Sequence, residues 1–351
     1  MSDGVKISAE RFFERLARLE THMSTHKEGL WGGCGAISIP LGASAGDVTY
    51  SKSAAMHLYL LGYEFPDSVM VLTKGHFYFM ATNKKLSYFK DQIVPHQNES
   101  TPKITLLEKS KDEGQNRENM NDLINAIRKD KGKKIGSFFK QEFDGKFIPQ
   151  WITMLKDSQL DTHEIGPALS NFFLVKDESE LDNCKRASIL TNKVLKHGFV
   201  QEMEAVLDSD ADITHEALAG KVEAIVMDPS KINVNISTES VDSCFTPIIQ
   251  SGGKYDIKVT AYSNAERLTA DVIIASMGAR YKGYCANVSR TFMVDAPPKV
   301  EKTYAILLSL YNYCLEQMVP GNEIKTVVEK ARAFVESKDS SLVSCMPKIL
   351  G

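Results

Sequence analysis

A charged segment in the middle of the sequence sets the strongest limit on the fold, because it separates two halves that differ in their pattern of apolar residues. The segment reads KDESE and runs from Lys176 to Glu180. Asp177 and Glu180 have the spacing of a capping box, which predicts a long helix from this point to about His197. At roughly 150 residues per domain, a chain of 351 residues favours about two domains. We therefore expect one domain over residues 1–176 and a second over residues 177–351.

The first half alternates helical and β patterns, which is typical of an α/β domain with a mixed sheet. Ser8 is expected to cap the first helix and Gly62 to end the second, since serine accepts from free helix amides and glycine adopts the left-handed conformation. Asn83 is the expected cap of a third helix. Further helices are expected over residues 123–127 and 147–155, and strands over residues 36–39, 48–50, 69–72, 77–80 and 134–138.

The second half begins with helices and then turns to β patterns. After the long helix, a second helix is expected to follow Asp212. Strands are expected over residues 232–234, 247–250, 257–261, 272–277 and 291–294, and final helices over residues 300–317 and 324–335. The whole chain is therefore expected to belong to the α/β (α+β) class.

The charge balance argues against a protein that binds DNA through a broad basic surface. The chain has 42 Lys and Arg residues against 45 Asp and Glu residues, which gives a net charge of −3. The basic cluster Arg128–Lys134 lies between an expected helix and an expected strand, which predicts a solvated turn. Little direct DNA binding is therefore expected.

The sequence also argues against a membrane or secreted protein and against a bound cofactor. No apolar stretch approaches the ~18 residues that span a bilayer, and the amino terminus lacks the apolar core of a signal peptide. The six cysteines are scattered without a CxxC pair, so we expect most of them to be ordinary buried thiols. No glycine-rich nucleotide-binding motif is present, and no cofactor is expected.

Two segments of the second half carry a family resemblance. They read TPIIQSGG over Thr246–Gly253 and MGARYKGYCANVSRTFMVD over Met277–Asp295. Together with Val175–Asp177 and Val319–Asn322, they resemble the pita-bread fold of creatinase, prolidase and aminopeptidase P over residues 175–351. The resemblance implies a creatinase-type amino-terminal domain followed by a pita-bread peptidase-like domain. Within that superfamily, the two segments are most similar to the large-subunit family of the FACT histone chaperones.

The resemblance also implies that the metal site of the peptidases is lost. Active members hold two divalent metals with two Asp, one His and two Glu, because such cations need carboxylate and imidazole ligands. At the positions of the two Asp this chain has Ser276 and Asn287, and the substrate-side His falls at about Val259. All eight histidines lie at or before His215, so we expect the pit to contain no imidazole. The chain is therefore expected to be catalytically inactive and free of bound metal.

The resemblance places further family segments after the last residue of this sequence. In the family, the closing strands of the pita-bread half and the remaining His and Glu ligands follow the segment that corresponds to Pro347–Gly351. We therefore expect the second domain to be incomplete at its carboxyl end. The middle histone-binding domains and the acidic tail of the family are also absent from this sequence, so the expected function is that of the amino-terminal module.

Two surfaces are candidates for binding a histone or a peptide. The first is an acidic stretch that attracts basic histone tails, although carboxylates before a helix also favour its amino end. The second is a peptide pit beside the lost metal site, where Arg290 is alternatively a structural ion-pair partner. We favour the acidic surface, because a cationic partner gains nothing from a pit lined by arginine. The residues are Glu202, Glu204, Asp208, Asp210 and Asp212 for the acidic stretch, and Gln250, Arg280, Tyr281 and Arg290 for the pit.

The FACT resemblance implies a histone and nucleosome chaperone in the nucleus, on chromosomes, with roles in transcription, replication and repair. The implied partners are the core histones, both the tetramer-forming and the dimer-forming pairs, and the small FACT subunit through regions outside this sequence. Two alternatives stay open: an active Xaa-Pro aminopeptidase or prolidase, and a pseudo-peptidase that binds peptides outside chromatin. The missing metal ligands argue against the first alternative, and nothing in the residues themselves excludes the second.

Overall fold

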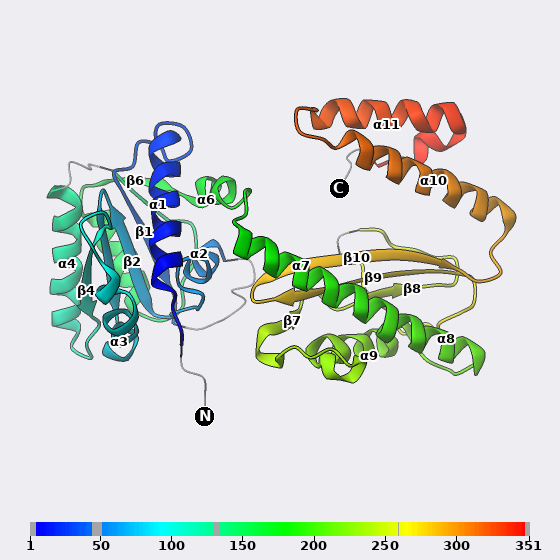
Figure 1. Ribbon diagram of the computed structural model, residues 1–351, viewed down its shortest axis with the longest axis horizontal. Coiled ribbons are helices and arrows are strands. Elements are labelled where there is room, and N and C mark those ends of the chain that lie inside the picture. Colours follow the sequence, from blue (N-terminus) through cyan, green and yellow to red (C-terminus); the bar gives the residue numbers. More distant parts are fainter. Residues whose placement is uncertain (1–4, 44–50, 130–133, 259, 348–351) are drawn as a thin grey trace. The chain divides into compact units, whose positions relative to one another are not determined.

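The chain forms two compact units in the computed structural model, which describes residues 5–43, 51–129, 134–258 and 260–347. The first unit ends at Asp177 and the second begins at Glu178. Each unit contains a sheet and a hydrophobic core of its own. The architecture is mixed α/β, which confirms the expected fold class (Figure 1).

The first unit is built on a mixed sheet of six described strands. In their order across the sheet, the strands are β4 (Lys103–Glu108), β3 (His76–Ala81), β2 (Ser68–Thr73), β1 (Ala36–Leu41), β5 (Lys134–Ser137) and β6 (Asp161–Glu164). β2 is antiparallel to β1 and β3, and the other neighbours are parallel. β1 and β2 are buried along their whole length, as expected for central strands covered on both faces.

Helices cover both faces of that sheet (Figure 1). Buried side chains of α1, α2, α3 and α6 form one core, and those of α4 and α5 form another. Ala36 and Ile37 are neighbours on β1 and belong to different cores, because successive strand residues point to opposite faces. The helices are α1 (Ala9–Thr25), α2 (Lys52–Leu61), α3 (Asn83–Gln92), α4 (Glu113–Lys129), α5 (Phe147–Asp157) and α6 (Gly166–Phe172), with a 3₁₀ turn at Val94–His96.

Most local expectations for the first unit are confirmed. Ser8 Oγ accepts a hydrogen bond from a helix amide at 3.3 Å, and Gly62 ends α2 with a φ of 74°. The strands expected over 69–72 and 77–80 are present as the antiparallel pair β2 and β3. The expected cap at Asn83 is wrong, because Asn83 is the first residue of α3 and Thr82 takes the capping position. The strand expected over 48–50 lies outside the described residues.

Two buried rings of the first unit differ in how their nitrogens are satisfied. The indole Nε1 of Trp151 donates to Ser38 Oγ at 2.9 Å, which joins α5 to β1. The imidazole of His57 on α2 is fully buried, and neither of its nitrogens has a hydrogen-bond partner within the described ranges. Burial lowers the pKa of His57 to about 3, because the imidazolium ion would lose its hydration there.

The second unit starts with a long helical segment and contains an antiparallel sheet. The helices before the sheet are α7 (Glu178–Lys193), α8 (Val200–Asp208) and α9 (His215–Met227). A π-helical segment, Val194–Phe199, joins α7 to α8. The described strands are β7 (Val241–Ser243), β8 (Ile248–Gln250), β9 (Val272–Tyr281) and β10 (Tyr284–Met293). β9 pairs with β10 on one side and with β7 and β8 along the other.

Helices α7, α8 and α9 pack their apolar side chains against one face of that sheet (Figure 1). Leu190, Val194, Phe199 and Met203, from the helical segment, are buried in this core. Two further helices, α10 (Pro298–Gln317) and α11 (Ile324–Lys338), follow the sheet. None of the helices that the structure describes is both long and apolar enough to cross a bilayer.

Two of the expected strands of the second unit are wrong. Pro229–Ile232 forms a 3₁₀ turn that Asn233 ends with a φ of 56°, so no strand runs over 232–234. The described part of 257–261 is a loop. Hydrogen bonds at Asp256 hold the start of this loop. The side-chain amide of Gln250 accepts from the Asp256 amide and donates to the Asp256 carbonyl. Both backbone polar groups of Asp256 therefore bond to a side chain.

The expectation that most cysteines are buried is also wrong. Cys34 is the buried one of the six, Cys285 and Cys345 are exposed, and the other three are half-buried.

Candidate functional site

The β9–β10 hairpin has one face in the core and one polar face. Its strands, ten residues each, pair along their whole length. Because side chains alternate along a strand, Met277 and Ala279 enter the core and their neighbours point to the other side. This other side, termed the polar face, carries Ser276, Gly278 and Arg280 on β9 and Cys285, Asn287 and Ser289 on β10.

Ser276 and Asn287, expected at the positions of two metal-binding aspartates, both belong to the polar face. The hydroxyl of Ser289 donates to Ser276 Oγ at 2.9 Å, and Asn287 lies opposite Gly278. The hairpin therefore offers hydroxyls, an amide, a thiol and a guanidinium on this face. Among the residues that the structure describes, no group of three or more His, Cys, Asp or Glu is arranged to hold a metal ion. Val259, the expected third position, lies outside them.

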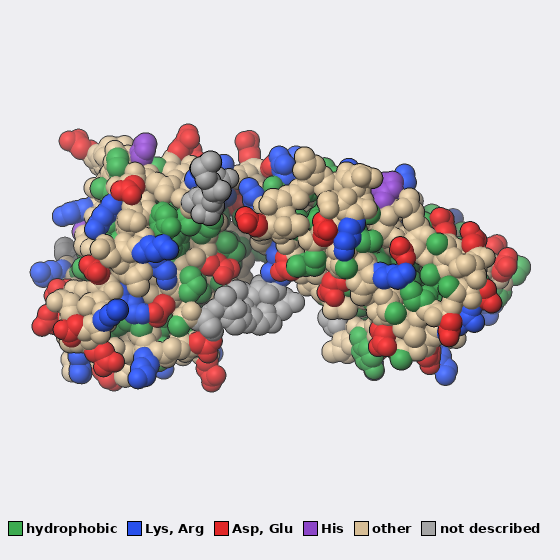
Figure 2. Space-filling model, turned by 90° about the horizontal axis from the view of Figure 1, so that it is seen from below, with side chains coloured by type: hydrophobic (Ala, Val, Ile, Leu, Met, Phe, Trp, Pro, Cys, Tyr) green, Lys and Arg blue, Asp and Glu red, His purple; other side chains and the backbone are tan. Residues whose placement is uncertain are grey.

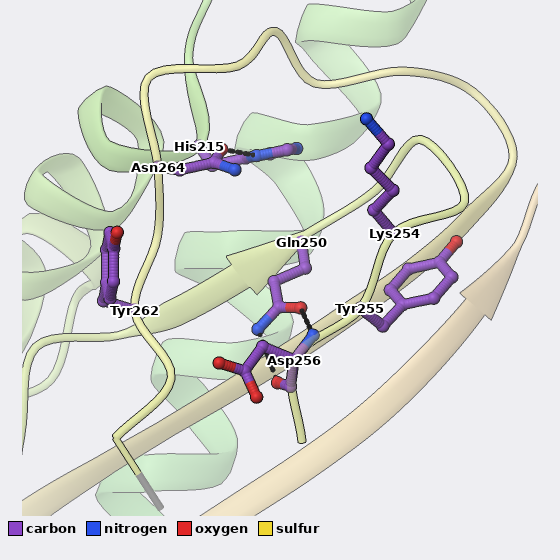
Figure 3. Close-up of a pocket in the computed structure, with 7 residues that line it drawn as sticks. All are labelled: His215, Gln250, Lys254, Tyr255, Asp256, Tyr262 and Asn264. Carbon is purple, nitrogen blue, oxygen red and sulfur yellow. Dashed lines mark hydrogen bonds between the residues drawn. The ribbon is translucent and has the colours of Figure 1, made fainter. Parts of the chain in front are cut away.

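A cavity of about 300 Å³ lies at the end of β8 (Figure 3). Ligand pockets range from about 300 to 1,000 Å³, so this one admits a side chain or a short peptide segment. Tyr262, on its rim, is 74% exposed, and Ile257 nearby in sequence is 91% exposed. Exposed apolar side chains beside a hollow are suited to contact a partner. The cavity is lined by His215, Gln250, Lys254, Tyr255, Asp256, Tyr262 and Asn264.

His215 lies in this cavity, so the expectation that no imidazole is present is wrong for the pocket at Gln250. The residue begins α9 and is 1% exposed. Its Nδ1 is 2.7 Å from Asn264 Oδ1, and its Nε2 is 2.7 Å from Ser251 Oγ. Both ring nitrogens are therefore engaged, and neither is free to bind a metal. His215 precedes the recognised segments in sequence, and the tertiary fold brings it to them.

Gln250 lines the cavity, but its side-chain amide forms hydrogen bonds with the backbone of the loop that follows β8. Asp256 N donates to Gln250 Oε1 at 2.7 Å, and Gln250 Nε2 donates to the Asp256 carbonyl at 2.9 Å. Figure 3 shows these two residues in the middle of the pocket, with Tyr262 on one side and Tyr255 with Lys254 on the other. The hydroxyl of Tyr255 donates to the Val272 carbonyl at 2.6 Å, which fixes that side. Tyr262, Lys254 and Asp256 are exposed lining residues, and one carboxylate oxygen of Asp256 accepts from the Lys258 amide at 3.0 Å.

Arg280, Tyr281 and Arg290, expected to line one pit, do not share one face. Arg280 lies half-buried on the polar face. Tyr281 is 9% exposed and belongs to the core. Arg290 pairs with core-facing Ala275, so it lies on the side opposite Arg280. The grouping fails because consecutive residues of a strand point to opposite faces.

Part of the acidic stretch is neutralised by ion pairs. Lys221 Nζ lies 3.0 Å from a Glu202 oxygen. Arg267 lies 2.5 Å from an Asp210 oxygen and 3.7 Å from an Asp212 oxygen. These three carboxylates therefore have cationic neighbours within their own unit.

Glu204 and Asp208 are the carboxylates of the stretch that are left for a partner. Both are exposed on α8, and neither forms an ion pair with any part of the chain that the structure describes. Their spacing of four places them on one side of the helix. They are termed the α8 acidic pair.

Basic side chains are dispersed over the surface in view. Figure 2 shows Lys and Arg interspersed with Asp and Glu over that face. In the cluster Arg128–Lys134, residues 130–133 lie outside the described residues, and Arg128 donates to the Ser158 carbonyl at 2.6 Å. The charges seen on this face are therefore mixed.

Comparison with known proteins shows that each unit matches a family model. Residues 7–168 match the amino-terminal lobe domain of FACT complex subunit SPT16, and residues 182–351 match metallopeptidase family M24. A solved X-Pro aminopeptidase from Thermotoga maritima has a TM-score of 0.63 at 17% identity, over 88% of this chain and 76% of that one. The chain therefore has a metallopeptidase-like fold with an amino-terminal lobe, which confirms the pita-bread resemblance.

More similar structures narrow the assignment. The SPT16 amino-terminal domain of Cicer arietinum is 33% identical with a TM-score of 0.86, over 98% of this chain and 80% of that one. That of Eremothecium gossypii is 28% identical with a TM-score of 0.87, over 97% and 80%. The chain belongs to the SPT16 family of FACT complex subunits. SPT16 of Arabidopsis thaliana is 34% identical over 355 residues, 98% of this chain and 33% of that protein, so the chain spans about a third of the length of the curated relatives it matches.

Proposed function

We propose that the chain is a non-enzymatic histone- and nucleosome-binding module of a FACT complex subunit. Its family membership supports this function, because the relatives are subunits of that complex. The proposed setting is the nucleus and its chromosomes, during transcription, replication and repair. The proposed partners are both pairs of core histones and, through regions outside this sequence, the small FACT subunit. The proposed domains are residues 1–176 and residues 177–351.

The residues of the polar face support the proposal that the module is not an enzyme. The active peptidases that the chain resembles have carboxylates at the positions of Ser276 and Asn287. A hydroxyl and an amide supply no negative charge. Two adjacent dications are held only when anionic ligands offset their charge. The hydrogen bond between the hydroxyls of Ser276 and Ser289 further engages this face within the hairpin.

The purified chain is expected to bind no stoichiometric Mn²⁺ and to release no proline from Xaa-Pro dipeptides. Ser276→Asp and Asn287→Asp, made singly, are each expected to remain inactive, because one carboxylate does not complete a two-metal site. Metal content after dialysis and proline release are the measurements, with an active prolidase as the positive control. Manganese-dependent release that increases in proportion to the protein concentration would contradict the proposal.

We propose the α8 acidic pair as the histone-contacting surface, because its carboxylates lack the cationic neighbours that the rest of the acidic stretch has. Histone segments are basic, and exposed carboxylates attract them through partly screened interactions. The expected affinity is weak, in the micromolar range or about −8 kcal/mol. Glu202, already paired with Lys221, is proposed to contribute less.

Replacing Glu204 and Asp208 with Gln and Asn is expected to weaken histone binding about three- to tenfold and to reduce its salt dependence. The reason is that each exposed ion pair contributes about 0.2–1 kcal/mol. Titration of both core-histone pairs at two salt concentrations measures the effect. The matched control is Glu10→Gln with Glu14→Gln, an exposed pair on α1 with the same spacing and charge change. Equal weakening by both double variants would mean that only the net charge matters.

The cavity at His215 supports a second candidate function, which is peptide binding unrelated to chromatin. Its volume of about 300 Å³ and the exposed Tyr262 suit a short peptide segment. If this candidate holds, Tyr262→Ala weakens peptide binding with little change in salt dependence, and the Glu204 and Asp208 changes have no effect. Unaltered histone affinity in both sets of variants would mean that the partner is not a histone.

A further inference from the structure

A further cavity lies in the first unit, between the turn that joins β2 to β3 and the last turns of α4. Its volume is about 730 Å³, and ligand pockets range from about 300 to 1,000 Å³. The hairpin contributes residues 73–76 and Tyr78 to its lining. The opposite wall is one side of α4, where lining residues are spaced by three and four. They are Asp122, Asn125, Ala126 and Lys129.

Two aromatic rings of β3 line this cavity as a stack. The rings of His76 and Tyr78 are parallel, with an interplanar angle of 5° and centroids 4.1 Å apart. Tyr78 packs against the core formed with α4 and α5, and residues two apart share a face of a strand, so both rings lie on the α4 side of the sheet. Thr105 on β4 holds the imidazole, with its Oγ1 2.9 Å from His76 Nε2. Both rings are half-buried, and they form a fixed aromatic platform in the cavity wall.

The charges around the platform are mostly positive. Among the described residues that line the cavity, Lys74, Arg128 and Lys129 are cationic and Asp122 is the one carboxylate. The Arg128 guanidinium is fixed in place, because it donates to the Ser158 carbonyl at 2.6 Å. Lys129 is exposed and forms no ion pair with the part of the chain that the structure describes. This balance favours an anionic ligand.

Two polar side chains of α4 distinguish between anionic ligands. Arg128 Nη1 donates to Asn125 Oδ1 at 3.2 Å, which leaves the Asn125 Nδ2 hydrogens as donors. Asp122, exposed three residues earlier, accepts from a base amino group or a sugar hydroxyl but repels another carboxylate. An acidic peptide would therefore meet Asp122 and leave the ring platform unused. A planar base joined to a phosphate uses the rings, the cations and both polar groups.

We propose that this cavity binds a nucleotide unit, with its base on the platform of His76 and Tyr78 and its phosphate beside Lys74 and Lys129. Proteins hold unpaired strands by stacking bases on aromatic rings beside a cationic groove. The bases of a duplex stack on one another, so the ligand is a single strand or a free nucleotide. The site goes beyond the proposed function, because no histone takes part. It is compatible with the net charge of −3, since one nucleotide site needs no broad basic surface.

The test is fluorescence anisotropy with a fluorescein-labelled deoxythymidine dodecamer. The dodecamer is expected to bind at least about fivefold more tightly than its duplex with the deoxyadenosine complement, because stacking on the platform needs an unpaired base. Calorimetric titration with AMP distinguishes the two sources of the nucleotide. Binding of AMP assigns the site to a free nucleotide, and binding of the dodecamer without AMP binding assigns it to a strand.

Variants separate the stacking contribution from the charge contribution. His76→Ala is expected to weaken binding about fivefold or more, whereas His76→Phe keeps a ring and is expected to retain most of the affinity although it also loses the hydrogen bond to Thr105. Lys129→Gln, in the last turn of α4, is expected to lower the salt slope of strand binding by about 0.7, the contribution of one phosphate contact. The matched control is Lys90→Gln, an exposed lysine in the last turn of α3, which covers the other face of the sheet.

A photocross-link locates the site without any variant. A strand that contains 5-iododeoxyuridine is expected to cross-link, on irradiation, to the peptide that carries His76 and Tyr78, as identified by mass spectrometry. Four results would each overturn the proposal: no binding of either the dodecamer or AMP, equal affinity for single strand and duplex, equal effects of Lys129→Gln and Lys90→Gln, or displacement of the dodecamer by polyglutamate as readily as by unlabelled dodecamer.

Discussion

Replacing Trp151 with alanine is expected to lower the free energy of unfolding of the first unit by about 3–5 kcal/mol. The indole is fully buried in the core formed with α4 and α5, and its removal leaves a cavity that the surrounding side chains only partly fill. The change also removes the hydrogen bond from Nε1 to Ser38 Oγ, so a buried hydroxyl on β1 loses a partner. Both losses act on the contact between α5 and the sheet.

Urea denaturation followed by tryptophan fluorescence measures this change in the first unit alone. The chain has two tryptophans, Trp31 and Trp151, and both lie before Asp177, so Trp31 remains as the reporter in the variant. Trp151→Phe keeps most of the buried ring and is expected to cost less than half as much. Leu174→Ala, at a position that is 72% exposed, is the surface control and is expected to change stability by less than about 0.5 kcal/mol. Similar urea midpoints for the wild type and Trp151→Ala would contradict the packing argument.

Acidification from pH 6.5 to pH 4.5 is expected to destabilise the first unit by about 2 kcal/mol through His57 alone. The pKa of His57 is about 3 in the folded chain and about 6.5 in the unfolded chain. Between these values the unfolded state binds up to one more proton, so the free energy of unfolding falls as the pH falls, and well above pH 6.5 the group has no effect. Carboxylates add their own losses at lower pH.

His57→Leu is expected to remove this part of the acid sensitivity. Neither imidazole nitrogen has a hydrogen-bond partner in the described ranges, so an apolar side chain of similar volume loses no hydrogen bond. Urea denaturation at pH 7.5, 6.5 and 4.5 gives the comparison, with His96→Leu at an exposed histidine as the control. The same loss of stability on acidification in His57→Leu and in the wild type would rule out His57 as the cause.

Local signals in the sequence predicted the elements whose ends are set by their own residues. Ser8 and Gly62 bound helices through capping geometry that needs no distant partner. β6 could not be predicted, because its sequence DTHE has neither apolar alternation nor a β-rich composition. It is a strand because β5 pairs with it in parallel register, with Ile135 opposite Thr162. Such pairing depends on the fold of the whole sheet.

The sequence predicts the features of the candidate site that depend only on the type of a residue. It does not predict those that depend on where the fold places a residue. The serine at 276 and the asparagine at 287 can be read directly, and their common face follows from strand pairing. Strand alternation separates Tyr281 from Arg280, and it needs the strand boundaries to be known. The cavity at His215 depends on α9 meeting the end of β8, which no local pattern reveals.

The π-helical segment between α7 and α8 decides which residues of the later helix face solvent. An α-helix turns by about 100° per residue, so in an unbroken helix Gln201 and Asp208 would lie on the same side as Val194. The π-helical segment has more residues per turn, so the buried side of the helix moves to later residues. Phe199 and Met203 therefore lie on the same buried side as Val194. The buried residues therefore follow one helical repeat before the π-helical segment and a shifted repeat after it. Asp208 reaches solvent because of a single extra residue in the turn before its helix, and not because of the composition of α8.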